Sequence, residues 1–100
     1  MTDVCLTLLV APEIEEKVLD QLLMSPVTTT FSSHPASSHG GHPASLDPRE
    51  QVLGRGDAAL IQVLLSDADA ASLLGELRQL FQGSGLRYWL SPVLTQGEIL

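Results

Sequence analysis

The chain contains little positive charge. Five lysine and arginine residues stand against twelve aspartate and glutamate residues, and the net charge at neutral pH is −7. Binding to nucleic-acid phosphates depends on clustered Lys and Arg side chains. The basic residues are instead spread along the chain, at Lys17, Arg49, Arg55, Arg78 and Arg87. We therefore expect no binding to nucleic acid.

Cysteine and long apolar segments are also scarce. Cys5 is the single cysteine, which excludes an intrachain disulfide and a CxxC motif, and its apolar neighbours predict a small buried side chain. The apolar runs are far shorter than the roughly 20 residues that a membrane-spanning helix needs. No basic, hydrophobic signal segment opens the chain. These features predict a cytoplasmic protein that does not insert into a membrane.

Motifs of the common enzyme classes are missing. The sequence contains no GxSxG nucleophile elbow, HExxH helix, Walker loop or dinucleotide-binding fingerprint. Catalytic groups also need a rigid frame, whereas the histidines lie in a segment rich in serine and glycine. We therefore expect a protein that is not an enzyme.

The residues that are present predict one small domain over residues 1–100, with 44% apolar residues. Short β-prone segments alternate with segments in which apolar residues recur at helical spacing. Strands are predicted at 4–10, about 27–33, 58–66 and in "GLRYWLSPVL"; helices are predicted at about 12–25 and over "ASLLGELRQLF", the second capped by Asp67 or Asp69. Pro92 should place the far end of the last strand at a sheet edge.

This order of elements predicts an α+β, ferredoxin-like (βαββαβ) sandwich with a long loop between the second and third strands. Both helices should cover one face of the sheet. The first strand also carries Cys5, Thr7 and Leu9 toward the opposite face, which is too apolar to face water. A second subunit usually covers such a face, so the sequence indicates a homo-oligomer.

All three histidines lie within the predicted flexible loop at about 34–56, in the stretch "HPASSHGGHP". Neutral imidazole binds zinc, copper, nickel and cobalt, and a Gly/Ser-rich loop can fold around an ion. We expect His34, His39 and His42 to bind a divalent transition metal. Asp47, Glu50 or a histidine from a neighbouring subunit would supply a further ligand. The alternative is a solvated loop that binds nothing.

The loop and third strand resemble those of the PII-like superfamily, which contains the nitrogen-regulatory PII signal transducers. The resemblance rests on "VTTTFSS", on Gly41-His42 and on "EQVLGRGDAALIQVLLSDAD". The "EQVLGR" stretch, residues 50–55, is similar to a branch of small PII-like proteins encoded beside heavy-metal efflux pumps. The resemblance implies a homotrimer with inward-facing sheets. It also implies a loop that signals to a protein partner, for instance a metal-efflux component.

The chain also departs from the PII pattern. The loop tyrosine that is uridylylated in PII proteins is missing, because Tyr88 belongs to the last predicted strand. The turn "QGSGLR" is shorter than the glycine-rich phosphate loop of PII proteins. An alternative effector is still a nucleotide or small anion in a subunit cleft, bound by Arg55, Arg87, Gly83 and Gly85. A third hypothesis is a structural interaction module with an unstructured tether.

Overall fold

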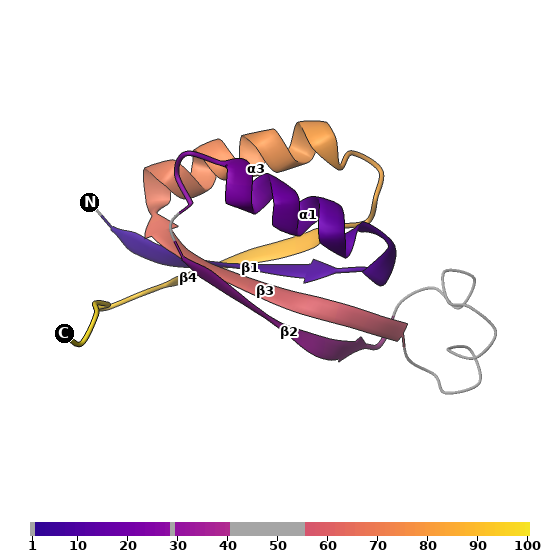
Figure 1. The fold of residues 1–100 in the computed structure, drawn as a ribbon, viewed down its shortest axis with the longest axis horizontal. Helices are drawn as coiled ribbons and strands as arrows, with labels where there is room; N and C mark the ends of the chain where they lie inside the picture. Colours follow the sequence, from indigo (N-terminus) through magenta and orange to yellow (C-terminus); the bar gives the residue numbers. More distant parts are fainter. Residues whose placement is uncertain (1, 29, 41–55) are drawn as a thin grey trace.

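The computed structural model describes residues 2–28, 30–40 and 56–100. Four antiparallel strands form one sheet in the order β2-β3-β1-β4, and two helices lie on one side of it (Figure 1). The elements are β1 (Asp3–Val10), α1 (Pro12–Met24), β2 (Phe31–Ser38), β3 (Gly56–Ser66), α3 (Asp67–Leu80) and β4 (Arg87–Pro92). The ferredoxin-like fold predicted from the sequence is confirmed.

The core lies between the two helices and the side of the sheet that they cover, which we call the helix face. On β1, Leu6, Leu8 and Val10 are fully buried, as the alternation in the sequence predicted. Helix α1 adds Val18 and Leu22, which lie four residues apart on one side of the helix. The rest of the core comes from β3 and α3: Ile61, Val63, Leu65, Ala70, Leu73, Leu74 and Leu77.

The second helix begins earlier than the sequence predicted. Its N-cap is Ser66, whose hydroxyl accepts a hydrogen bond from the backbone N–H of Asp69 at 3.1 Å. The predicted caps Asp67 and Asp69 instead lie in the first turn, where their negative charge stabilises the positive end of the helix dipole. No loop separates β3 from α3, because Ser66 ends the strand and caps the helix.

The second strand is the largest correction to the sequence prediction. The sequence predicts this strand at about 27–33, whereas β2 spans Phe31–Ser38 and therefore contains the first residues of the predicted loop. Its pairing with β3 continues to the partners Ser38 and Gly56, so hydrogen bonds to β3 hold a segment that has little strand propensity. Pro35 is tolerated there because β2 is an edge strand. Residues 41–55 of the predicted loop lie outside the described residues.

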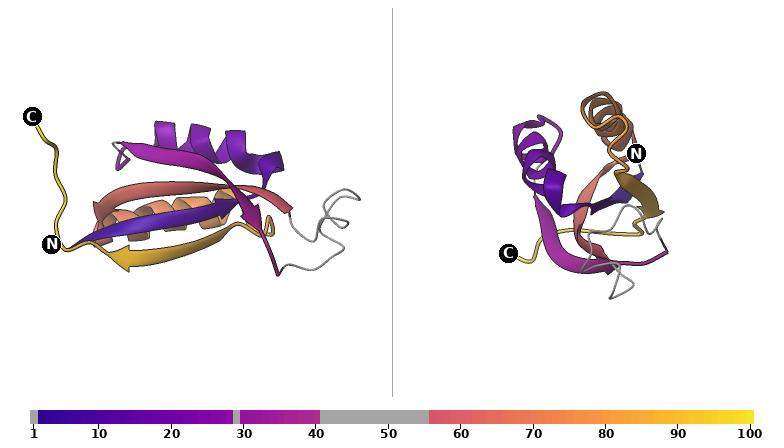
Figure 2. Two further views of the ribbon diagram at one scale, coloured as in Figure 1. Left: turned by 90° about the horizontal axis from the view of Figure 1, so that it is seen from below. Right: turned by 90° about the vertical axis from the view of Figure 1, so that its right-hand side faces the viewer.

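Strand β4 forms the other edge of the sheet, as predicted from Pro92. Beyond it, residues 93–100 form neither helix nor strand, and they lead away from the sheet (Figure 2). We call these residues the C-terminal segment. Within the described ranges, no helix is both long enough and apolar enough to cross a membrane.

Candidate functional site

The histidines do not lie together in the described backbone. His34 is exposed in β2 and pairs with Leu60 on the face of the sheet opposite the helices, which we call the open face. His39 follows the end of β2, and His42 lies outside the described residues. At a strand rise of about 3.3 Å per residue, the Cα atom of His34 is roughly 13 Å from that of Ser38, the residue before His39.

This separation bears on the predicted metal site. An ion holds imidazole nitrogens at about 2 Å, so ligands must converge on one point. In residues 2–28, 30–40 and 56–100, no three His, Cys, Asp or Glu side chains form a group that could hold a metal ion. The candidate ligands Asp47 and Glu50 lie outside these ranges.

Two of the four residues predicted to bind an anion line one cavity. Gly85 and Arg87 border a cavity of about 410 Å³, together with the start of α1 at Pro12 and the paired strand ends at Ser38 and Gly56. Gly83 is in the same turn, with a φ of 80°, but it does not line the cavity. Arg55 lies outside the described residues. The cavity therefore lies between the turn after α3 and the end of the sheet at which β2 ends and β3 begins.

The charges in this cavity do not strongly favour an anion. Arg87 is accompanied by Glu13 from the first turn of α1 and by Asp57 from β3. Among the described residues of the lining, one positive and two negative side chains leave an excess of negative charge. The backbone N–H groups at the start of α1 attract anions, but Pro12 supplies no N–H there.

The open face carries an apolar patch, as predicted from the first strand, among polar side chains such as Gln62 and His34. Across the sheet, Thr7 pairs with Gln62 on one side and with Trp89 on the other, so these three side chains share the face. Leu64 and Trp89 expose 43% and 45% of their surface. Cys5 is only partly buried on this face, which corrects the prediction of a buried side chain; its Sγ lies 3.9 Å from Thr7 Oγ1.

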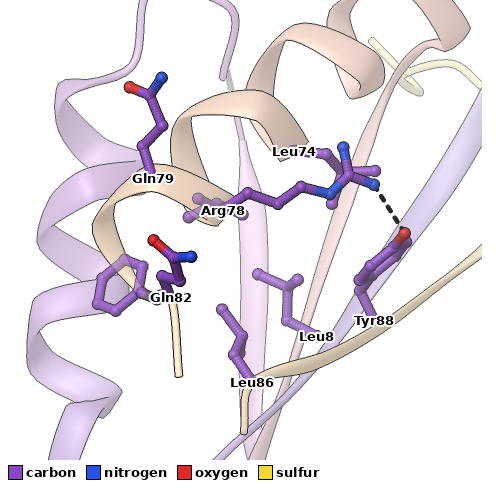
Figure 3. A pocket seen from close by; sticks show the side chains of 9 residues that line it. Leu8, Leu74, Arg78, Gln79, Gln82, Leu86 and Tyr88 are labelled. Carbon is purple, nitrogen blue, oxygen red and sulfur yellow. Dashed lines mark hydrogen bonds between the residues drawn. The ribbon is translucent and has the colours of Figure 1, made fainter. Parts of the chain in front are cut away.

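A second apolar surface lies between α3 and β4, on the helix face. A groove of about 450 Å³ is floored by buried leucines, among them Leu8 and Leu77. At its rim, Arg78 donates a hydrogen bond to the hydroxyl of Tyr88 at 2.8 Å, and the guanidinium carbon lies 5.6 Å from the ring centroid (Figure 3). We call this surface the α3–β4 groove. The remaining lining residues are Leu74, Gln79, Phe81, Gln82 and Leu86.

Sequence reasoning missed the α3–β4 groove. Its residues are ordinary core positions of a helix and a strand, and no motif joins them. The available signal was the alternation of Leu86, Tyr88 and Leu90 in the last strand, which showed that this strand has an apolar side. It did not show that the side remains partly uncovered at the edge, where Tyr88 and Leu90 expose 44% and 46% of their surface.

The fold is shared with solved structures of three kinds. A DUF3240 family protein from Shewanella baltica OS155 superposes with a TM-score of 0.82 at 19% identity, over 100% of this chain and 99% of that one. CPII, a nitrogen regulatory PII-like protein from Thiomonas intermedia K12 bound to ADP, AMP and bicarbonate, gives 0.73 at 14% identity, over 99% and 98% of the two chains. The periplasmic divalent cation tolerance protein CutA from Archaeoglobus fulgidus gives 0.68 at 12%, over 98% and 89%.

These similarities place the chain in the PII/CutA-like class of ferredoxin-type folds. At such low sequence identities these similarities establish the fold but do not identify a ligand. No curated protein matches the sequence. The model of one family, described as a protein of unknown function (DUF3240), matches residues 1–100. The chain therefore belongs to the DUF3240 family.

Proposed function

We propose that this DUF3240 protein is a cytoplasmic, homotrimeric regulatory protein without catalytic activity. Its effector would be a divalent transition metal bound around the β2–β3 connection, and its output would be contact with a protein partner such as a metal-efflux component. The observation that carries the proposal is the position of the histidines. All three lie within nine residues of sequence, in β2 and in the residues that follow it, in a chain with a PII-like fold.

Assembly through the open face is the first part of the proposal. The face gathers Leu9, Leu60, Leu64 and Trp89 from three adjacent strands, and the last two remain more than two-fifths exposed. Apolar surface of this kind favours contact with another subunit, because burial removes it from water. Three copies, rather than two, is the number that the PII resemblance implies.

The bounds of β2 limit how the histidines of one copy could bind an ion together. His34 lies within β2, roughly 13 Å from the last residue of the strand. An ion bound by both His34 and His39 would therefore require either a second copy or rearrangement of the end of β2. An ion on the threefold axis of the proposed trimer would be bound once per three chains. A site within one chain, or one at each interface between neighbouring copies, would bind one ion per chain.

Isothermal titration of metal-free protein with zinc, copper, nickel and cobalt tests this part. Binding should disappear in a His34→Ala, His39→Ala, His42→Ala triple variant and persist in Asp20→Ala, a control that removes one exposed carboxylate from α1. The single variant His34→Ala tests whether the strand histidine is a ligand, because it weakens binding only if His34 contacts the ion. Unchanged affinity in the triple variant would rule out the histidine site.

A second candidate effector is a nucleotide or another small anion in the cavity lined by Gly85 and Arg87. The location favours it, because the cavity joins α1, the turn after α3 and the ends of β2 and β3. Glu13 and Asp57 oppose it within one chain. Thermal denaturation with ADP, AMP and bicarbonate, the ligands named for CPII, provides the test. A rise in Tm that Arg87→Ala abolishes would favour the anion over the metal.

A further inference from the structure

The C-terminal segment exposes apolar side chains that its own domain does not cover. Leu94, Ile99 and Leu100 have relative exposures of 103%, 99% and 107%. Two hydrogen bonds hold the beginning of the segment to β1: the N–H of Val93 donates to the carbonyl oxygen of Asp3 at 3.2 Å, and the Gln96 amide donates to the Asp3 carboxylate at 3.4 Å. Exposed apolar side chains on an extended segment favour docking on an apolar surface.

The α3–β4 groove has the chemistry to receive such a segment. Its floor is leucine, and its rim carries the amides of Gln79 and Gln82 and the Arg78–Tyr88 pair (Figure 3). Arg78 is the only charged side chain among the described residues that line it. The groove also runs beside β4, an edge strand whose outer backbone groups are not paired within the sheet. An extended segment can bind to such an edge by main-chain hydrogen bonds.

We propose that the C-terminal segment of one copy docks in the α3–β4 groove of a second copy. Ile99 and Leu100 would contact the leucine floor. Glu98, the only charged residue in positions 93–100, would lie beside Arg78 at the rim. The segment and the groove thus match in apolar character and in charge. This contact does not depend on the effector, and it uses the face of the sheet opposite the open face.

Docking in the groove of the same chain is opposed by the topology. The groove lies at the start of β4, around Leu86 and Tyr88, whereas the segment leaves the other end of that strand at Pro92. Residues 96–98 border a cavity with Cys5 and Leu64, on the open-face side of the sheet. The groove lies on the helix face, so the segment would have to cross the edge of the sheet and reverse direction.

Intermolecular paramagnetic broadening tests the contact directly. Isotope-labelled full chain is mixed, under conditions of subunit exchange, with unlabelled chain that carries a nitroxide at Thr95→Cys in a Cys5→Ser background. We expect the amide signals of Arg78, Phe81 and Leu86 in the labelled copies to lose more than half their intensity and to recover when the nitroxide is reduced. A nitroxide at Glu16→Cys, on the exposed side of α1, is the matched control and should not broaden them.

A charge exchange provides a second readout. Glu98→Lys and Arg78→Glu should each weaken self-association about two- to fivefold, and the double variant should restore it. Restoration separates the proposed pair from a general effect of losing the Arg78–Tyr88 hydrogen bond. Broadening confined to open-face amides such as Gln62 and Trp89, or no broadening in the mixed sample, would overturn the proposal. Neither result would decide whether copies also assemble through the open face, because that assembly is tested separately by a substitution at Leu64.

Discussion

Replacing Leu64 by lysine should weaken the proposed assembly through the open face while leaving the subunit folded. Leu64 lies on β3 in the open face and already exposes 43% of its surface in the single chain. A lysine there keeps its charged group in water, and substitutions at such surface positions change the free energy of unfolding by only about 0.5 kcal/mol. The same lysine in a contact between copies would lose the water around its charged group.

The effect on assembly follows from two contributions. Covering the exposed two-fifths of a leucine stabilises the contact by about 0.6 to 1.3 kcal/mol, taking about 1.5 to 3 kcal/mol for a whole side chain. Burying the ammonium group adds a penalty of several kcal/mol. A combined loss of about 3 kcal/mol per copy corresponds to roughly 100-fold weaker association.

Sedimentation velocity over a range of concentrations measures the association, and circular dichroism measures the Tm of each variant. The matched control is Leu23→Lys on α1, where the leucine exposes 72% of its surface and lies away from the open face. We expect this control to assemble as the parent chain does. If Leu64→Lys and the parent show the same concentration dependence, the open face is not the interface between copies.

Three further substitutions test the fold itself by chemical denaturation. Ile61→Ala removes a fully buried side chain between the sheet and the helices and should reduce the free energy of unfolding by about 2 to 5 kcal/mol; a loss below 1 kcal/mol would contradict the position of the core. Ser66→Ala removes the cap hydrogen bond from the backbone N–H of Asp69 and should reduce the free energy of unfolding by about 1 kcal/mol. Ser72→Ala, which changes an exposed serine of the same helix, is its control. Gly83→Ala should reduce the free energy of unfolding by about 1 to 2 kcal/mol, because an alanine is strained at a φ of 80°. No atom lies within 4 Å of the added Cβ, so backbone strain is the only cost. An unchanged free energy of unfolding would mean that the turn relaxes.

The sequence alone determined the order of the elements and the side of each that is buried. Period-two alternation in β1 and helical spacing in α1 are local properties of the chain, so Leu8 and Val18 could be assigned to the core without knowing their partners. The apolar patch on the open face followed from the same alternation. Pro92 correctly indicated an edge strand, because proline cannot donate a hydrogen bond to a neighbouring strand.

Tertiary structure decided what depends on pairing between distant segments. The "SHPASS" part of β2 has no apolar alternation, and it is a strand because β3 supplies partners for its backbone groups. That pairing also separates His34 from His39, which the sequence placed in one loop. The groove rim joins Arg78 to Tyr88, and a cavity joins Arg87 to the start of α1. Local patterns contain no information on such contacts, because the packing of helices on the sheet brings these residues together.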